Sequence, residues 1–294
     1  MLDLLRRKRL VTVIIPTRNK APRLHLTLAC LSAQQVDREW EVVVVNDGST
    51  DATESVIKAM KSDLPLRSID GPQRGRGAAR NAGVAAAVGD VLIFLDDDVL
   101  TSPSFVQTHA DHQRQAPGLA HGKLRELIGA AKVHDPQHGG PGFPPLHPDR
   151  ICREGLFPDG MRVSPNALER AIERLYATTA PAIVPWLASV GANLSSSRDA
   201  WEVLGGFDES FGTSWGCEDL EFGFRAHQKG VPLAFLPEAF GIHMTHHNPD
   251  RWAEHQVNLQ RFRELHPVPD VDRLALLLSF DGSAEEYLSA QGNQ

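Results

Sequence analysis

The stretch Gly89–Leu100, GDVLIFLDDDVL, constrains the fold of this chain more than any other. It contains five consecutive apolar residues, Val91–Leu95, and then three aspartates, Asp96, Asp97 and Asp98. A continuous apolar run of this length, closed by polar residues, predicts a buried central strand of a parallel sheet. Ligands of open α/β sheets bind beyond the carboxyl ends of the strands, which is where the aspartates lie. Neighbouring carboxylates repel each other unless a cation neutralises them, and oxygen ligands of this kind suit Mg²⁺ or Mn²⁺.

The same aspartates also fit a purely structural interpretation. They could form a solvated acidic loop before the next helix, with Asp98 or Ser102 as the cap of that helix. This stretch alone does not choose between a metal site and a capped loop.

Apolar strands and amphipathic helices alternate through the first hundred residues. With 294 residues, of which 41% are hydrophobic and 23% charged, the chain is long enough for one large α/β domain or two small ones. The alternation predicts a doubly wound, mostly parallel sheet of the nucleotide-binding type. The expected strands are Leu10–Ile15, Trp40–Val45 and Leu64–Ile69 with the Val91–Leu95 run, and the expected helices include Arg23–Gln34 and Ala78–Val88.

The second half has a less regular pattern. Residues Pro117–Phe157 are rich in Gly, Pro and His, and we expect an irregular region there. A helix is expected at Asn166–Thr178, a strand of small residues at Gly191–Ser197, and another strand at Val231–Leu236.

Two further groups of polar residues follow those strands. Glu218 and Asp219 open a predicted helix, where the helix dipole favours carboxylates whatever else they do, so capping is again an alternative. Beyond the last predicted strand the chain has three imidazoles in five residues, at His243, His246 and His247. Packing alone does not account for three imidazoles so close together.

Charge and cysteine usage exclude several classes. The formal net charge of -7 gives no indication of a nucleic-acid partner. The three cysteines are too few and too far apart for a disulfide framework, which fits a reducing cytoplasm. No apolar run approaches about 20 residues, so no membrane-spanning helix is expected. The sequence does not indicate an oligomeric state.

Six segments taken together resemble glycosyltransferase family 2, whose members have the GT-A fold. They occur in the family's order: VTVIIPTRN, VVVVNDGSTD, GRGAARNAG, GDVLIFLDDDV, GANLSSSRDAWEVLGGFDE and WGCEDLEFGFRAHQKG. The resemblance implies a Rossmann-like sheet with a nucleotide-sugar-binding half at residues 10–116. It also implies a smaller acceptor-binding and catalytic half at 117–247, which includes an irregular insertion at 117–185. Residues 248–294 are then a C-terminal helical tail.

The resemblance also implies roles for single residues on the donor side. Asp47 matches a carboxylate that accepts the ring N–H of a pyrimidine, so the expected donor is a UDP-sugar or dTDP-sugar. Asp96 and Asp98 match the family's Asp-x-Asp motif and are both candidate ligands of Mn²⁺ or Mg²⁺; Asp98 is the better match to the metal ligand and Asp96 to the ribose contact. His243 matches a further metal ligand, with His246 as the alternative. The other implied donor-binding residues are Pro16, Thr17, Arg18, Arg76, Arg80 and Asp97.

On the acceptor side, the resemblance implies that Asp219 is the general base and that Glu218 binds acceptor hydroxyls, or the reverse. Trp215 and Gly216 are expected to contact the acceptor, which could be a peptide, a glycan or a small natural product. One direct displacement by the acceptor would invert the anomeric centre, and a hexosyl or hexosaminyl group is expected to be transferred.

Two other functions remain as alternatives. A catalytically inactive GT-A fold could bind a sugar or a partner protein. A nucleotidyltransferase is the other alternative, but that class would have a glycine-rich signature with a lysine directly after the first strand, and Pro16–Asn19 lacks it.

Overall fold

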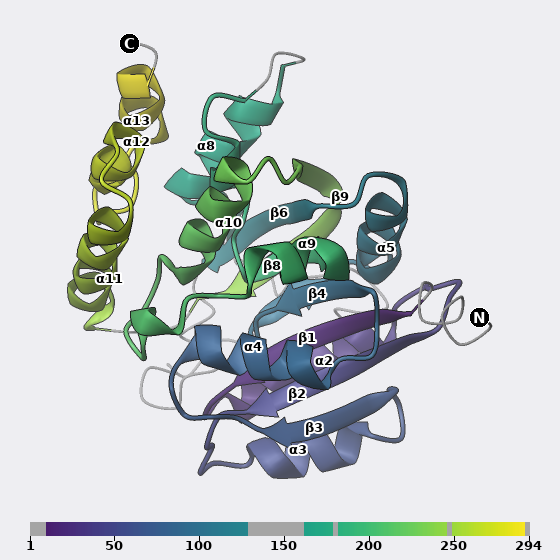
Figure 1. Ribbon diagram of the computed structural model, residues 1–294. Coiled ribbons are helices and arrows are strands. Elements are labelled where there is room, and N and C mark those ends of the chain that lie inside the picture. Colours follow the sequence, from purple (N-terminus) through teal and green to yellow (C-terminus); the bar gives the residue numbers. More distant parts are fainter. Residues whose placement is uncertain (1–9, 129–161, 179–181, 246–248, 292–294) are drawn as a thin grey trace.

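The computed structural model describes residues 10–128, 162–178, 182–245 and 249–291. These residues form a mixed α/β structure around one curled sheet (Figure 1). The strand order is β3-β2-β1-β4-β8-β6-β9-β5, and β7 pairs with β6.

The first half of the sheet is parallel, as predicted. Its strands are β1 (Val11–Thr17), β2 (Trp40–Asn46), β3 (Leu66–Asp70) and β4 (Val91–Leu95). β1 lies between β2 and β4 and pairs with both in parallel. The connecting helices are α2 (Ala21–Ser32), α3 (Thr53–Met60) and α4 (Arg76–Ala86).

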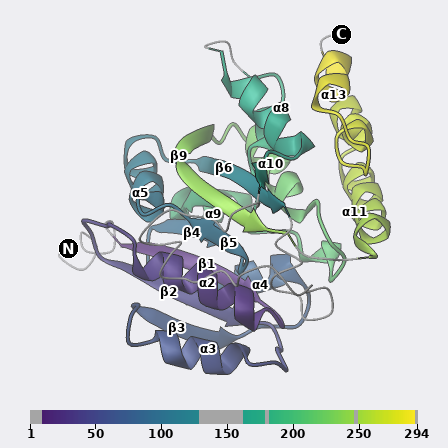
Figure 2. The ribbon, with the colours of Figure 1, turned by 180° about the vertical axis from the view of Figure 1, so that it is seen from behind.

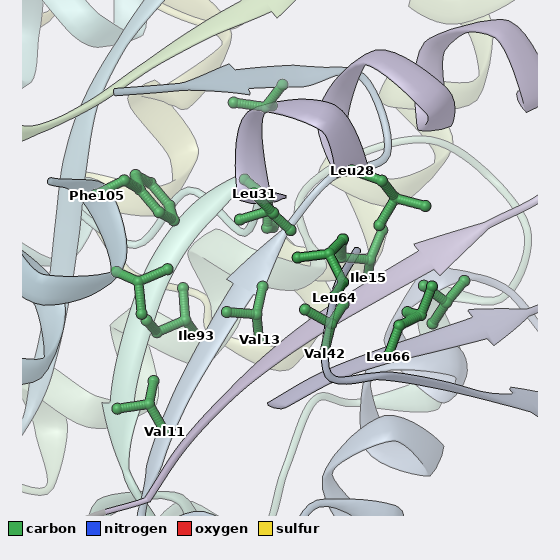
Figure 3. Close-up of a cluster of buried hydrophobic side chains, with 14 of the residues drawn as sticks. Val11, Val13, Ile15, Leu28, Leu31, Val42, Leu64, Leu66, Ile93 and Phe105 are labelled. Carbon is green, nitrogen blue, oxygen red and sulfur yellow. The ribbon is translucent and has the colours of Figure 1, made fainter. Parts of the chain in front are cut away.

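Alternate side chains of a strand point to opposite faces of the sheet, and in this half both sets include buried apolar residues. Helices therefore cover both faces. On one face, Val11, Val13 and Ile15 of β1 pack with Leu28 and Leu31 of α2 (Figure 3). On the other face, residues of β1, β2 and β4 pack with α4 and with helices from later in the chain. The sheet is therefore doubly wound, as the alternation predicted.

The second half of the sheet is mixed. Its strands are β5 (Val99–Thr101), β6 (Leu119–Ile128), β7 (Arg162–Ser164), β8 (Asn193–Ser197) and β9 (Leu233–Met244). β8 pairs antiparallel with both β4 and β6, so β4 is central but has a parallel neighbour on one side only.

Two expectations for this half were wrong. Residues Leu119–Ile128 form the long central strand β6 rather than part of an irregular region. The strand predicted to end at Leu236 continues to Met244, so His243 lies in β9 and pairs with Glu126 of β6. The histidines at 134, 138 and 147, in the same predicted irregular region, lie outside the described residues.

The remaining helices are α5 (Phe105–Gln115), α8 (Ala167–Tyr176), α9 (Arg198–Leu204), α10 (Glu218–Gln228), α11 (Arg251–Leu265), α12 (Pro269–Asp272) and α13 (Ala284–Gln291). Both views show α11–α13 standing beside α8 and α10 (Figures 1 and 2). Trp186, Phe224 and Phe262 join these elements in a hydrophobic cluster of their own. None of the described helices combines the length and apolar character needed to cross a bilayer.

The capping alternative is wrong for the aspartates after β4 and holds in part at α10. β5 follows the three aspartates directly, and α5 starts at Phe105 without a side-chain cap from Ser104. α10 has Cys217 at its N-cap position without a side-chain cap bond, but Asp219 Oδ1 accepts a hydrogen bond of 2.9 Å from the backbone N–H of Leu220 in the first turn. The carboxylates at both places also have partners elsewhere in the fold.

Candidate active site

A cavity of about 680 Å³ lies beyond the carboxyl ends of the first-half strands. It brings together every predicted site residue that the structure describes. His246 lies outside the described residues. The predicted residues lining the cavity are Pro16, Thr17, Arg18, Asp47, Arg76, Arg80, Asp96, Asp97, Asp98, Trp215, Gly216, Glu218, Asp219 and His243.

One end of the cavity is formed by the ends of β1 and β2. Thr17 ends β1 and pairs with the residue before Asp47, so the two loops lie side by side. Asp47 is buried, and its Oδ1 accepts a hydrogen bond of 2.6 Å from the backbone N–H of Gln73. A Cβ at Gly71 would lie 2.4 Å from that oxygen, so a glycine here lets the loop approach the carboxylate.

Asp98 and His243 face each other across β5 and β9. His243 Nε2 lies 3.3 Å from Asp98 Oδ1, and His243 Nδ1 lies 2.8 Å from Glu126 Oε2. Burial opposes the charged imidazole, but the Asp98 and Glu126 carboxylates hold the pKa of His243 well above its usual value. Lys20 also contacts Asp98, with Nζ 3.0 Å from Oδ2.

These residues fit a divalent metal ion. A carboxylate oxygen and an imidazole nitrogen lie within 3.3 Å of each other, and Glu126 holds the imidazole through its other nitrogen, as carboxylates that orient metal-binding histidines do. Among the described residues no group of three or more His, Cys, Asp and Glu side chains could hold a metal. Two protein ligands are nevertheless ordinary for Mg²⁺, which is completed by substrate phosphates and water.

Asp96 and Asp97 have different surroundings although they are neighbours. Asp96 Oδ1 accepts a hydrogen bond of 2.8 Å from Arg80 Nη2. Asp97 is buried, and burial raises its pKa to about 7; Lys20 opposes the shift, whereas Asp98 and Asp96 add to it. The three consecutive aspartates therefore differ in their partners: Asp96 contacts Arg80, Asp98 contacts Lys20, and Asp97 is buried with a raised pKa.

Glu218 and Asp219 also line the cavity, at the start of α10. Glu218 is buried, and its Oε1 accepts a hydrogen bond of 2.8 Å from Arg80 Nη1. Asp219 Oδ2 accepts from the backbone N–H of Gly191 at 2.8 Å. Burial raises the pKa of Asp219 to about 6; the negative Glu218 adds to the shift, and Arg80 opposes it.

Aromatic rings from two elements form the far end of the cavity. Trp215 precedes α10, whereas Trp252 and His255 lie on α11, and the two tryptophan ring centroids are 6.5 Å apart. Arg251 lies over the Trp215 ring, 4.1 Å from its centroid. Sequence reasoning placed Trp252 on a helix but did not assign it, Arg251 or His255 to the site.

Lys20 and Glu126 were also missed. No local signal marks either residue, because each acquires its role from a partner on a distant strand or loop. Lys20 contacts the predicted ligand Asp98, and Glu126 lies in β6, which the sequence did not predict. Neither residue could be assigned to the site without these contacts.

Comparison with known proteins relates the chain to glycosyltransferases. Residues 12–129 match the family model "Glycosyl transferase family 2", and residues 182–248 match "N-terminal domain of galactosyltransferase". A validoxylamine A glucosyltransferase of Streptomyces hygroscopicus subsp. jinggangensis is 34% identical over 276 residues, which are 88% of this chain and 61% of that protein. A chondroitin synthase of Escherichia coli is 26% identical over 87% of this chain and 38% of its own length.

Solved structures agree at the level of the fold. A mannosyltransferase from Pyrobaculum calidifontis in complex with GDP-Man and Mn²⁺ superposes with a TM-score of 0.61 at 18% identity, over 97% of this chain and 73% of that one. Residues 1–349 of Staphylococcus aureus TarS in complex with UDP-GlcNAc superpose with a TM-score of 0.57 at 18% identity, over 96% of this chain and 70% of that one.

The described residues have the GT-A fold of these solved glycosyltransferases. Within that fold class, residues 12–129 match glycosyltransferase family 2, and the chain as a whole is similar to named glycosyltransferases. It spans about 60% of the length of the validoxylamine A glucosyltransferases that it matches.

Proposed function

We propose that this protein transfers a sugar from a UDP-sugar or dTDP-sugar to a hydroxyl of an acceptor, with inversion and with the help of Mn²⁺ or Mg²⁺. The observation that carries the proposal is that one cavity is lined both by the Asp98–His243 pair and by Glu218 and Asp219. Arg80 contacts both Asp96 and Glu218, so the residues assigned to the donor and to the acceptor are close to each other.

The donor nucleotide is assigned to the end of the cavity formed by β1 and β2. Pro16, Thr17 and Arg18 follow β1, and the buried Asp47 follows β2. A buried carboxylate at this point favours a base that offers a ring N–H, as uracil and thymine do. The half-exposed Arg76 supplies a cation for the diphosphate, and Asp96 is assigned to the ribose.

The metal ion is assigned to Asp98 and His243, with His246 as the alternative outside the described residues. When bound, a divalent ion neutralises the charge that develops on the leaving nucleoside diphosphate. Glu126 keeps His243 Nε2 directed at Asp98 by holding Nδ1. The solved complex with Mn²⁺ belongs to a protein of the same fold and supports this assignment in general terms.

Asp219 is assigned as the general base. A general base works best when its pKa lies near the working pH, and burial raises the pKa of Asp219 to about 6. Its carboxylate is fixed by the Gly191 N–H, so it can receive the acceptor proton without moving. With Asp219 as the base, the acceptor hydroxyl attacks the anomeric carbon directly and displaces the nucleoside diphosphate. A single displacement of this kind inverts the anomeric carbon.

The acceptor is assigned to the end lined by Trp215, Gly216 and Trp252. Aromatic faces and a buried carboxylate, here Glu218, together suit a polyhydroxylated ring, which has one apolar face and hydroxyls around its edge. A glucosyl donor is the first to test, because the matched relatives at 34% and 33% identity are named glucosyltransferases.

The test is a panel of UDP-, dTDP- and GDP-sugars with Mn²⁺ or Mg²⁺, scored by release of nucleoside diphosphate with and without sugar and cyclitol acceptors. We expect release from a UDP- or dTDP-sugar, loss of release with chelator, and loss in the Asp98→Ala variant. Tighter binding of GDP than of UDP in calorimetry would contradict the donor assignment, and no release from any donor would contradict the function.

A further inference from the structure

Arg80 is almost fully buried at the inner wall of the cavity. It is 1% exposed, and its guanidinium carbon lies 5.3 Å from the centre of the Phe207 ring. Nη1 donates to Glu218 Oε1 and Nη2 donates to Asp96 Oδ1, both at 2.8 Å. Both terminal nitrogens are thus engaged with protein carboxylates, one on the donor side and one on the acceptor side.

Gly191 closes the space around this guanidinium. A Cβ at Gly191 would lie 2.7 Å from Arg80 Cζ, so the backbone there packs directly against Arg80. The N–H of the same glycine donates to Asp219 Oδ2. One short backbone segment therefore contacts both Arg80 and the proposed base.

Glu218 has one oxygen directed away from this contact. Its Oε2 is buried and makes no hydrogen bond with the described residues, whereas Oε1 is held by Arg80. A buried carboxylate oxygen without a donor is costly unless something fills its place. In this cavity, a hydroxyl of the acceptor would provide that hydrogen bond.

We propose that Arg80 is a positioning residue that couples the donor and acceptor subsites, rather than a cation that binds the donor. By holding Asp96 and Glu218 with the two arms of one rigid guanidinium, it fixes the distance between the carboxylate assigned to the ribose and the carboxylate that receives the acceptor. This inference rests on the proposed function and deepens it.

The conservative change Arg80→Lys tests the proposal. An ammonium group keeps the charge but cannot present two parallel arms to two carboxylates. We expect the Kd for UDP with Mn²⁺ to stay near that of wild type, the acceptor KM to rise, and kcat to fall by about 10²-fold, the effect of a displacement of the reacting groups of about 1 Å.

Arg225→Lys is a matched control. Arg225 Nε contacts Glu221 Oε1 at 2.7 Å, and its guanidinium lies 5.5 Å from the centre of the Phe222 ring, as Arg80 contacts a carboxylate and a ring. Arg225 is not among the described residues that line the cavity. Its replacement should lower the melting temperature while UDP affinity, acceptor KM and kcat stay near wild type.

A second variant covers the case in which Arg80→Lys does not fold. The pair Arg80→Met and Glu218→Gln removes the two buried charges together and leaves Asp96, whose side chain is 30% exposed, without its Arg80 partner. Glu218→Gln alone is the reference: we expect the double variant to fold, to bind UDP as wild type does, and to have a lower kcat than Glu218→Gln, whereas equal constants in the two variants would contradict a positioning role of Arg80.

Three further results would contradict the inference about Arg80, and one of them would also contradict the proposed function. A loss of UDP affinity of tenfold or more in Arg80→Lys, with an unchanged acceptor KM, would show that Arg80 binds the donor and would overturn the inference alone. Unchanged kinetic constants would also overturn it. A wild-type protein that binds no nucleotide would overturn the proposed function and the inference with it.

Discussion

Asp219 illustrates how the surroundings of one residue set its chemistry. Two backbone N–H groups, of Gly191 and Leu220, donate to its carboxylate at 2.8 and 2.9 Å and favour the ionised form. Burial and the neighbouring Glu218 favour the protonated form and win, which raises the pKa to about 6. The result is a carboxylate that is ionised at neutral pH and still able to hold a proton.

Asp219→Asn should therefore remove the proposed base with little effect on the fold. We expect kcat to fall by about 10²–10⁴-fold, because an amide cannot take the acceptor proton. UDP affinity and melting temperature should stay near wild type. Glu218→Gln is the comparison: if Glu218 binds the acceptor, its change should mainly raise the acceptor KM, and a larger loss of kcat in Glu218→Gln than in Asp219→Asn would mean that the two roles are reversed.

The same pKa predicts the pH dependence of turnover. Asp219 must be ionised to accept a proton, so kcat should be level above about pH 6 and should fall as the pH decreases through that value. A profile of kcat from pH 4.5 to 8 measures this directly. An acid limb near pH 4, the ordinary range of an aspartate, would exclude Asp219 as the base in the environment described.

Glu126 gives a prediction about the metal that does not depend on turnover. Since it holds His243 Nδ1 at 2.8 Å, Glu126→Gln should weaken Mn²⁺ binding by about 10–100-fold, as changes at residues that orient a metal ligand do. Electron paramagnetic resonance of free Mn²⁺ in the presence of UDP measures the affinity. Glu173→Gln is the control, because Glu173 pairs with Arg125 and Lys123 outside the cavity lining; equal affinities in all three proteins would contradict the assignment of His243.

Among the elements, those of the first half could be predicted from sequence and those of the second half only in part. β4 is a continuous apolar run, and β1 and β2 contain the buried apolar runs Val13–Ile15 and Val42–Val45, which is the clearest strand signal. β6 contains the fully buried polar residue His121, which contacts Glu169 Oε1 and the carbonyl of Asn193. A polar residue that is satisfied by distant partners breaks the apolar pattern without breaking the strand.

β9 was predicted too short for a related reason. It contains Pro237 and Gly241, which usually end or weaken a strand, and its pairing with β6 shifts register between Gly122 and Leu124. The site residues Asp96, Asp98 and Asp219 could be found because they directly follow or open strong local patterns. Lys20, Glu126 and Arg251 could not, because their proximity to the site exists only in the tertiary structure.

The start of α4 gives a prediction at the level of the element. Gly75, at the N-cap position, has a φ of 98°, and a Cβ there would lie 1.8 Å from the carbonyl oxygen of Gly212. Gly75→Ala should markedly lower the melting temperature and reduce UDP binding, because α4 carries Arg76 and Arg80. Gly205→Ala is the control: its φ of 75° is similar but its surroundings are open, so a loss of about 1 kcal/mol or less is expected in urea unfolding.

At the scale of the whole molecule, the C-terminal helices are part of the core. Phe262 of α11 is fully buried and makes edge-to-face contacts with Trp186 and Phe224. α11 also carries Trp252 and His255, which line the cavity. The region expected as a helical tail at 248–294 is thus joined to the site through its packing, whereas its limits as a domain remain a prediction.

Phe262→Ala should accordingly affect both stability and the acceptor end of the cavity. We expect a loss of about 3–5 kcal/mol in urea unfolding, the usual effect of removing a buried aromatic ring, together with a raised acceptor KM. Val257→Ala, at a 61% exposed position of the same helix, should change neither. A stable Phe262→Ala variant with normal kinetics would show that α11 does not depend on this contact.

The contribution of α11 to the cavity has a consequence for synthesis of the protein. The parallel strands β1–β4 and their helices are translated first, and they can pair with one another before the second half of the chain leaves the ribosome. The aromatic wall from Trp252 and His255 is added only after β9 has been made. The residues assigned to the nucleotide base, Pro16 to Arg18 and Asp47, are therefore made long before this wall, whereas the assigned metal ligand His243 is made shortly before it. Binding of UDP, with and without Mn²⁺, to ribosome-bound chains of increasing length would show when each part of the site forms.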